Sequence, residues 1–520
     1  MIFRDPRRRS YAAPVLSGLL FAYAYMGGWW IADVLFLLPL LGWLDDEEDP
    51  VRRRWGGFVF GAVAYGVTMH YHIAMAEHSW LAWPLWFGFA LAEALKTSVL
   101  FAWATRLKRR SNWSWAVVLP PVWISAEWVT QHLGDLRMTG DHLSHAVSGA
   151  PYLIQFAEWT GPYGVAAGVL LTNAWLHEAM QARWKHARRT AWIALAVLWT
   201  AGGLLNAGLW MRASRAAEAA PTVKFAALQP NVPLAIKHDL DSAAAQTETL
   251  RRMSEEAAAA GASWVVWPES SRPYVFYEFA ERPETRGMPE VEELAGRLGV
   301  SILVGAEHAE VAAGEIGDYT NGAFLVWPDG ALQDDWGGKV YLVPFTEALP
   351  FRGLFGPLVE GRGGEWDWVA GGFDPAPRSA LLRGPNGVRM GVLVCYEEFF
   401  SELSDGLRER GANVQAVITN DAWFGRTFLQ RYLNNAVRLR AIENRTAFVR
   451  AANTGISSLI DPVGRVTAST GLFEEAVIVG ELPLLEASTV YNRIGDVPAY
   501  AALAALAAMT IGTWRRRSRT

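Results

Sequence analysis

Cysteine is almost absent from this chain of 520 residues, in which it occurs only as Cys395. One cysteine excludes an intramolecular disulfide, so the thiol has no partner within the chain. Charged residues make up only 19% of the chain, and the net charge of −5 gives no reason to expect nucleic acid as a partner. The segment 222–485 has no Walker-type glycine loop, heptad pattern or internal repeat. A disulfide framework, a P-loop and a nucleic-acid-binding surface are therefore not expected.

Apolar residues are abundant, at 51%, and they are concentrated towards the two ends of the chain. A helix needs about 20 apolar residues to cross a bilayer. Eight stretches approach this length, of which the second and the last are somewhat short: 11–29, 30–44, 56–73, 80–104, 114–130, 151–177, 191–211 and 498–514. We therefore predict a membrane domain over 1–212 with about seven transmembrane helices. A further transmembrane helix and a basic tail are predicted over 491–520.

Arginine and lysine are unevenly distributed between these stretches. Short loops rich in these residues stay on the cytoplasmic side of a membrane. They gather before the first stretch, in alternate loops and in the tail: Arg4, Arg7, Arg8, Arg9, Arg52, Arg53, Arg54, Arg106, Lys108, Arg109, Arg110, Arg183, Lys185, Arg188, Arg189, Arg515, Arg516, Arg517 and Arg519. The opposite loops, 74–79 and 131–150, contain only Arg137. Both termini are thus expected in the cytoplasm and 213–490 outside it. No small-residue cleavage site follows the first stretch, which we expect to be retained.

The segment 213–490 has the pattern of a soluble α/β domain. Short runs of β-branched or aromatic residues alternate with helical periodicity, as expected for layers of sheet and helix. The predicted strands are 223–228, 264–267, 302–306, 323–327, 388–394, 414–419, 447–451 and 457–460. The predicted helices are 240–260, 289–298, 398–409 and 428–444.

Ionisable residues follow directly on several short apolar runs of this domain. Glu269 follows one, Lys339 and Glu347 flank the next, and Cys395 and Glu397 follow a third. Taken singly, a charge at a strand end is more often solvated, and a lone cysteine is more often a small buried apolar residue. Together they supply what acyl transfer needs. A carboxylate takes the thiol proton, the thiolate attacks a carbonyl group, and an ammonium with backbone N–H groups stabilises the oxyanion.

The order Glu269, Lys339, Cys395 resembles the catalytic triad of the nitrilase superfamily, whose members have an α-β-β-α sandwich. Further motifs resemble the bacterial apolipoprotein N-acyltransferases, which carry such a domain on an eight-span membrane anchor. These motifs are Trp267-Pro-Glu-Ser, Leu342-Val-Pro-Phe-x-Glu, Cys395-Tyr-Glu, Thr419-Asn-Asp-Ala-Trp-Phe-Gly, Arg440-Ala-Ile-Glu-Asn-Arg, Arg450-Ala-Ala-Asn-Thr-Gly-Ile-Ser and Ile460-Asp-Pro-Val-Gly-Arg. The resemblance implies a multi-span α-helical membrane domain plus a nitrilase-like α/β sandwich over 213–490.

The resemblance also implies a reaction. A fatty acyl chain would pass from a phospholipid, expected to be phosphatidylethanolamine, through a Cys395 thioester to the N-terminal amine of an S-diacylglyceryl-cysteine apolipoprotein. Glu269 would be the general base, and Lys339 with the N–H of Tyr396 would stabilise the oxyanion. Glu347 and Glu397 would position Lys339 and the substrate. No cofactor is expected, and the protein is expected to be a monomer in the bacterial inner membrane with its catalytic domain on the periplasmic side.

Some features depart from this family pattern. Where a Gln-His pair is expected, the chain has Gln430-Arg431, and the fourth apolar stretch carries Glu93 and Lys96, which at this spacing can neutralise each other. Other features are candidates for secondary roles. Trp366, Trp368, Phe351 and Phe355 could guide lipid tails, and Glu127 is expected to be a structural polar residue within the membrane.

No metal site is predicted. His70, His72, His78, His142 and His145 gather on the outer side, but thiol chemistry needs no metal and no acidic pair has ligand spacing. Two other functions remain open. One is a membrane-anchored nitrilase-like amidase with water as the acceptor, and the other is a transporter or scaffold whose outer domain only binds.

Overall fold

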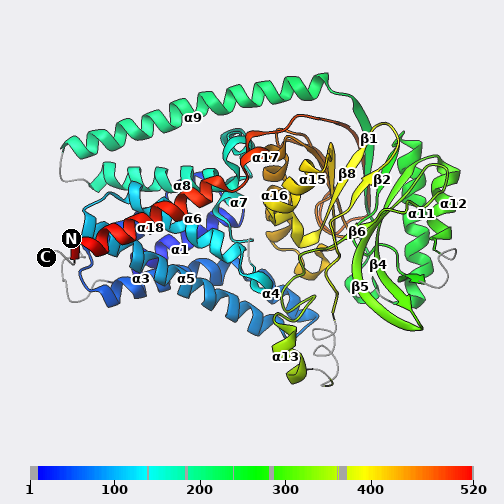
Figure 1. Ribbon diagram of the computed structural model, residues 1–520, viewed down its shortest axis with the longest axis horizontal. Helices are drawn as coiled ribbons and strands as arrows, with labels where there is room; N and C mark the ends of the chain where they lie inside the picture. The colour runs from blue at the N-terminus through cyan, green and yellow to red at the C-terminus, as the bar shows by residue number, and fades with distance from the viewer. Residues whose placement is uncertain are drawn as a thin grey trace.

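The computed structural model describes residues 10–137, 140–181, 185–237, 239–279, 286–359, 361 and 372–517. It has two parts, which lie side by side in Figure 1. The first and last segments of the chain form a bundle of long helices. The segment between them forms two β-sheets with helices on their outer faces.

The helical part consists of helices that run roughly along one direction (Figure 1). Their bounds are α1 (Ala12–Tyr25), α2 (Leu38–Asp46), α3 (Pro50–Thr68), α4 (Tyr71–Ala74), α5 (Ala82–Ser111), α6 (Trp115–Gln131), α7 (Leu143–Val147), α8 (Ala157–Gln181), α9 (Lys185–Ala219) and α18 (Val497–Arg517). Among the described residues, α5, α9 and α18 are long and apolar enough to cross a membrane. The shorter α1 is also apolar.

The second predicted membrane stretch, 30–44, is not one continuous helix. A 3₁₀ turn at Trp30–Val34 precedes α2, which begins at Leu38. The side chain of Asn173 in α8 occupies this break, where it accepts the N–H of Leu37 at 3.0 Å and donates to the carbonyl of Asp33 at 2.8 Å. A polar side chain from a neighbouring helix thus satisfies backbone groups that the interruption leaves open.

The middle part contains two mixed sheets. The first has the order β13-β1-β2-β4-β5-β6, with β3 paired to β4, and the second has the order β12-β11-β10-β9-β8-β7. The first sheet contains β1 (Thr222–Gln229), β2 (Trp264–Val266), β3 (Phe276–Phe279), β4 (Ser301–Ala312), β5 (Glu315–Val326), β6 (Gly337–Gly338) and β13 (Ala476–Pro483). The second contains β7 (Leu381–Arg383), β8 (Arg389–Val394), β9 (Val414–Thr419), β10 (Ala447–Ala452), β11 (Ser458–Ile460) and β12 (Val466–Ser469).

The two sheets pack face to face with helices outside them. Phe225, Trp264 and Leu325 of the first sheet and Val392 and Ala416 of the second belong to one buried core. The outer face of the first sheet is covered by α11 (Ala243–Ala259) and α12 (Pro289–Leu298), and that of the second by α15 (Ser401–Glu409) and α16 (Leu429–Asn444). This arrangement confirms the predicted α-β-β-α sandwich.

Helix α16 lies between the second sheet and the membrane helices (Figure 1). The ring of Tyr432 stacks on Tyr25 of α1 with centroids 5.2 Å apart. At the other end of α16, Arg445 pairs with Glu158 and donates to the side chain of Gln155 at 2.7 Å. The sandwich therefore rests directly on the helical bundle, which places the ends of β8 and β9 near the membrane helices.

Candidate active site

Glu269 lies in the turn after β2. The strand β4 passes this turn so closely that a Cβ on Gly305 would be 2.4 Å from the carbonyl oxygen of Pro268, so a residue other than glycine would displace the turn. The carboxylate accepts hydrogen bonds from the side-chain amide of Asn321 and from the backbone N–H of Asn420, each at 2.7 Å. Both oxygens are therefore held in a defined direction by groups from both sheets.

Lys339 follows the short strand β6 and is fully buried. Its backbone N–H donates to the carbonyl of Asn321 at 2.9 Å. Its ammonium donates to Glu347 at 2.6 Å and lies 3.8 Å from the carboxylate of Glu269. Glu347 also accepts the N–H of Val343 at 2.8 Å. The predicted role of Glu347 as the residue that positions Lys339 agrees with these contacts.

Cys395 is the first residue of a 3₁₀ turn, Cys395–Phe399, which follows β8 directly. Its φ angle is 54°. A positive φ is uncommon outside glycine, and such strain is concentrated at functional sites. The sharp turn lets the half-buried Cys395 line a cavity, while the strand before it is buried from Met390 to Val394.

Burial and charge set the protonation states of these groups. Burial raises the pKa of Glu269, which the Lys339 ammonium opposes and Glu347 reinforces. Burial also raises the pKa of the Cys395 thiol well above its ordinary value, and the negative charge of Glu269 raises it further. Burial alone would lower the pKa of Lys339, but Glu347, the Cys395 thiolate and Glu269 together raise it. The resting thiol therefore keeps its proton, and a base must remove it during attack.

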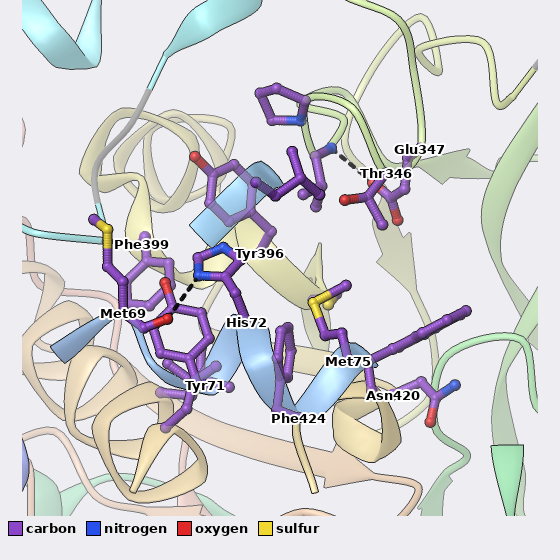
Figure 2. A pocket seen from close by; sticks show the side chains of 18 of the residues that line it. Met69, Tyr71, His72, Met75, Thr346, Glu347, Tyr396, Phe399, Asn420 and Phe424 are labelled. Atoms are coloured by element: carbon purple, nitrogen blue, oxygen red, sulfur yellow. Dashed lines mark hydrogen bonds between the residues drawn. The ribbon is translucent and has the colours of Figure 1, made fainter. Parts of the chain in front are cut away.

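The cavity lined by Cys395 has a volume of about 620 Å³ and extends from the sandwich to the membrane helices. Glu269, Glu347 and Tyr396 line it from the sandwich. In the helical part it is lined by Tyr25, by Gly140 and Asp141, and by residues between 65 and 89, which are Tyr65, Thr68, Met69, Tyr71, His72, Met75, Leu85 and Phe89. Figure 2 shows Met69, Tyr71 and His72 on one side of the cavity and Thr346, Glu347 and Asn420 on the other. A largely apolar cavity of this kind can hold an acyl chain with its carbonyl group at the thiol.

Glu397 acts on the backbone and not on the cavity. It is fully buried and is not among the described residues that line the cavity. Its carboxylate accepts the backbone N–H groups of Val340 at 2.7 Å, Tyr341 at 3.1 Å and Val394 at 2.8 Å. Burial raises the pKa of Glu397 to about 7 against the effect of these bonds. This one side chain therefore ties the backbone after Lys339 to the strand end before the thiol.

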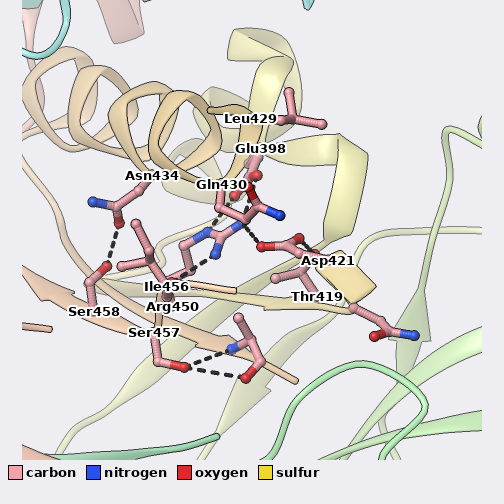
Figure 3. A network of polar contacts seen from close by, with 12 residues as sticks. Glu398, Thr419, Asp421, Leu429, Gln430, Asn434, Arg450, Ile456, Ser457 and Ser458 are labelled. Carbon is pink, nitrogen blue, oxygen red and sulfur yellow. Dashed lines mark hydrogen bonds and ion pairs between the residues drawn. The ribbon is translucent and has the colours of Figure 1, made fainter. Parts of the chain in front are cut away.

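A buried ion network lies behind the turn that carries the thiol (Figure 3). Arg450 of β10 donates to Glu398 at 3.0 and 3.1 Å and to Asp421 at 3.1 Å, and all three side chains are fully buried. Glu398 belongs to the turn that Cys395 begins, and Asp421 follows Asn420, whose N–H binds the base. The network thus braces two turns that the site needs.

Other residues singled out from the sequence lie elsewhere. Trp366 and Trp368 are outside the described residues. Phe351 and Phe355 lie at the start of α13 (Arg352–Val359), are exposed, and have ring centroids 6.5 Å apart. The hydroxyl of Tyr396 donates to the carbonyl of Arg137 at 2.9 Å, which links the thiol's turn to an outer loop of the helical part.

The polar residues of the membrane stretches form local pairs. Lys96 forms ion pairs with Glu93 and with Asp141, which confirms the predicted neutralisation of Glu93. The Nε2 atom of His142 lies 3.3 Å from the carboxylate of Glu127. Within the described part of the chain, no group of three or more His, Cys, Asp and Glu side chains could hold a metal ion.

Sequence reasoning missed several polar residues of this site, among them Asn321 and Lys237. Asn321 lies in β5 and holds Glu269, and Lys237 ends the short helix α10 (Leu234–Lys237) and lines the cavity. Neither follows a predicted strand end or lies in a recognised motif, so only contacts between distant segments bring them to the site. Asn420 did carry a signal, because it lies in one of the quoted motifs.

Comparisons with known proteins agree with this arrangement. Residues 224–491 match the family model described as carbon-nitrogen hydrolase, and residues 17–175 match the one described as apolipoprotein N-acyltransferase N-terminal domain. Two solved structures are similar to about half of this chain: an amidase from Nesterenkonia sp. and Saccharomyces cerevisiae Nit3. The amidase is 19% identical to this chain, and the match covers 50% of this chain and 90% of the amidase with a TM-score of 0.36. Nit3 is also 19% identical, and the match covers 53% of this chain and 94% of Nit3 with a TM-score of 0.38. The chain thus combines a carbon-nitrogen hydrolase domain with a helical membrane domain.

Curated relatives match over nearly the whole chain. The apolipoprotein N-acyltransferase of Geobacter metallireducens is 32% identical over 98% of this chain and 96% of its own. That of Gloeobacter violaceus is 29% identical over 92% of this chain and 89% of its own. The chain belongs to the apolipoprotein N-acyltransferase family, and it is a membrane-bound acyltransferase.

Proposed function

We propose that this enzyme N-acylates apolipoproteins with a fatty acyl chain that it takes from a phospholipid and carries as a thioester on Cys395. Phosphatidylethanolamine is the proposed donor. The acceptor is the free α-amine of an S-diacylglyceryl-cysteine at the start of an apolipoprotein. The observation that carries the proposal is the cavity shared by the thiol and the membrane helices.

In the first half-reaction, Glu269 takes the proton of the Cys395 thiol as the sulfur attacks the ester carbonyl. The negative oxygen of the tetrahedral intermediate is stabilised by the Lys339 ammonium and the N–H of Tyr396. Collapse breaks the ester C–O bond, and Glu269 returns the proton to the leaving oxygen of the lysophospholipid. A new C–S bond has then replaced the C–O bond.

In the second half-reaction, the α-amine of the acceptor attacks the thioester carbonyl and Glu269 accepts a proton from its nitrogen. Breaking the C–S bond releases the amide and the thiolate, which takes the proton back. Glu347 holds Lys339 in both halves through its contact at 2.6 Å. Glu269 carries each proton between donor and acceptor in this scheme, so the two half-reactions balance without a cofactor.

We further propose that the enzyme lies in the bacterial inner membrane with the sandwich on the periplasmic side. The basic loops support this orientation. Arg109 and Arg110 end α5 at one end of the bundle, and the sandwich is attached at the opposite end (Figure 1). A donor lipid and a lipidated acceptor could then both reach the cavity by lateral diffusion within the membrane.

The direct test is to incubate the purified protein with labelled phosphatidylethanolamine and to search for an acyl adduct by mass spectrometry. We expect an adduct on Cys395 that hydroxylamine removes, because hydroxylamine cleaves thioesters. Adding a diacylglyceryl-cysteine peptide should convert the adduct into an N-acylated peptide. The variant Cys395→Ala is the matched control and should give neither product.

An adduct that persists in Cys395→Ala, or the absence of any adduct in the natural protein, would contradict the proposal. Release of the acyl chain as free fatty acid in the presence of the peptide would instead support the amidase-like alternative, in which water is the acceptor. The cavity wall built from membrane helices favours the lipidated acceptor.

A further inference from the structure

The lining of the cavity is of two kinds. Where the membrane helices form it, it is mainly apolar or aromatic, as Met69, Met75, Leu85 and Phe89 show. Near Glu269, which Lys237 and Asn321 both contact, polar side chains of the first sheet and α10 line it: Lys237, Glu307, Tyr319 and Asn321. The mechanism uses Asn321 only to hold Glu269 and does not use the other three. Lys237 is the only lysine or arginine among the described residues that line the cavity.

Lys237 is buried, with 3% of its surface exposed. Its ammonium donates to the carbonyl oxygens of Glu269 at 3.2 Å and of Ser270 at 2.9 Å. An ammonium has three N–H donors, and two carbonyl bonds leave capacity for an anionic ligand. Burial lowers the pKa of Lys237 to about 8, although Glu269 and Glu307 act in the opposite direction. A bound anion would therefore stabilise the charged form of this lysine.

Glu307 lies across the sheet from Asn321. The two residues are direct partners in the antiparallel ladder of β4 and β5, which puts their side chains on one face about 5 Å apart. Tyr319 lies two residues before Asn321 on the same face, and its hydroxyl donates to Glu307. The Oδ1 atom of Asn321 is buried and has no hydrogen-bond partner among the described residues. This polar part of the lining therefore presents acceptors for a group that carries N–H donors.

The two kinds of lining match the two parts of a glycerophospholipid. An acyl chain fits the apolar part while its ester lies at Cys395, and the headgroup reaches the polar part near Glu269. We propose that Lys237 binds the phosphate, and that Glu307 with Asn321 binds the ammonium, of a zwitterionic phospholipid donor. This inference rests on the proposed function and assigns the binding of its headgroup to two charged residues of opposite sign, of which Glu307 sets the preference for a zwitterionic donor.

The test compares two donors with identical acyl chains, the zwitterionic phosphatidylethanolamine and the anionic phosphatidylglycerol. The rate of thioester formation on Cys395 in a single turnover is measured by intact-protein mass spectrometry for the full-length enzyme. The variant Glu307→Gln keeps the size of the side chain and an acceptor for Tyr319 but removes the charge. We expect the ratio of the two rates, ethanolamine over glycerol, to fall at least about tenfold, as for loss of one hydrogen bond to a charged group.

Glu310→Gln is the matched control, because Glu310 lies on the same strand but is exposed and does not line the cavity among the described residues. Its rate ratio should equal that of the natural protein. An unchanged ratio in Glu307→Gln, with thioester formed from both donors, would overturn the headgroup assignment and leave the proposed function intact. No thioester from either donor in the natural protein would overturn the proposed function itself.

A second measurement needs no variant and so does not depend on folding of Glu307→Gln. N-acetyl phosphatidylethanolamine keeps the phosphate and most of the headgroup but loses the positive charge. The natural protein should form thioester from it at least about tenfold more slowly than from the parent lipid. Equal rates with these two donors would overturn the role given to Glu307 and Asn321.

Discussion

At the scale of single residues, burial opposes ionisation of both the proposed nucleophile, Cys395, and its proposed base, Glu269. The pKa values of the Cys395 thiol and the Glu269 carboxyl are both raised, chiefly by burial. A raised carboxylate pKa makes Glu269 a stronger base, because it moves towards the pKa of the group that it deprotonates. The Lys339 ammonium, 3.8 Å away, limits this shift and so favours the ionised form of Glu269.

The first prediction concerns the pH dependence of thioester formation. Glu269 acts only when ionised, so the single-turnover rate should rise as the pH increases through its raised pKa and level off above it. Activity should therefore be lost on acidification at a higher pH than the ordinary glutamate pKa of 4.5 would give. Glu269→Gln should abolish this acidic limb and reduce the rate by about 10²–10⁴-fold.

The control for this prediction is Glu256→Gln, because Glu256 is an exposed residue of α11 in the same domain. Its pH profile should coincide with that of the natural protein. If Glu269→Gln retained the acidic limb with an unchanged midpoint, another group would have to be the base.

A second prediction at this scale concerns Glu397, whose two oxygens together accept three backbone N–H groups. Glutamine can replace only one of these oxygens, since its NH₂ group would face an N–H donor. Glu397→Gln should lower the free energy of unfolding by about 1–3 kcal/mol. It should also slow thioester formation, because the strand ends at Lys339 and Cys395 are no longer tied together.

Chemical unfolding followed by tryptophan fluorescence and the single-turnover assay measure these two effects. Glu409→Gln, at an exposed position at the end of α15, should change neither. A full rate in Glu397→Gln would show that the tie is not needed for catalysis.

At the scale of elements, the site depends on the turns that follow β8 and β9, and a buried ion network holds both turns in place. Arg450 in β10 binds Glu398 and Asp421, which lie in the turns after β8 and β9 (Figure 3). Removal of a buried arginine that lies between two carboxylates leaves both negative charges without a cation. The brace therefore contributes to the geometry of the thiol and the base as well as to the fold.

The third prediction follows from this brace. Arg450→Met should lower the free energy of unfolding by about 3–5 kcal/mol, because it leaves two buried carboxylates without their cation. Arg378→Met removes an exposed pair with Asp335 and should cost less than about 1 kcal/mol. Denaturant unfolding of both variants checks the difference. Equal costs would mean that the buried network does not stabilise the sandwich.

The strands that the sequence predicted lie in buried runs, and of β4 and β5 only the segments 302–306 and 323–327, buried apart from Trp327, were predicted. β1, β8, β9 and β10 have burial along nearly their whole length and were predicted with small errors at their ends. β6 consists of two glycines and β7 of three residues, so neither has a pattern to detect. β13 does contain a β-branched run, Ala476-Val-Ile-Val, and its omission was an error of interpretation.

The same contrast holds within the candidate site. Glu269, Lys339 and Cys395 were predicted because each lies in a recognisable motif beside a short apolar run. Asn321 and Lys237 reach the site only through long-range pairing, since β5 lies beside β4 and α10 packs under the turn at Glu269. Contacts of this kind depend on register and packing, which a single sequence does not specify.

At the scale of the whole molecule, the sandwich is held on the membrane bundle by specific contacts and not only by the chain connections. Arg445 binds Glu158 and Gln155 of the helical part, and Tyr396 binds the carbonyl of Arg137. These contacts hold the thiol at a fixed height above the bundle. A fixed height matters because the donor ester lies at a defined depth in a lipid leaflet.

The last prediction tests the orientation that this architecture needs. Because Cys395 is the only cysteine, Cys395→Ala leaves a chain with none, and any introduced cysteine becomes a unique site for labelling. Glu315→Cys lies at the exposed tip of the β4–β5 hairpin, and Arg110→Cys lies at the exposed end of α5 that carries the basic residues.

A membrane-impermeant maleimide should label the Glu315→Cys variant in cells whose inner membrane is intact. It should label the Arg110→Cys variant only after that membrane is permeabilised, because a basic loop is held in the cytoplasm. The reverse pattern would place the thiol on the cytoplasmic side and contradict the proposed periplasmic location.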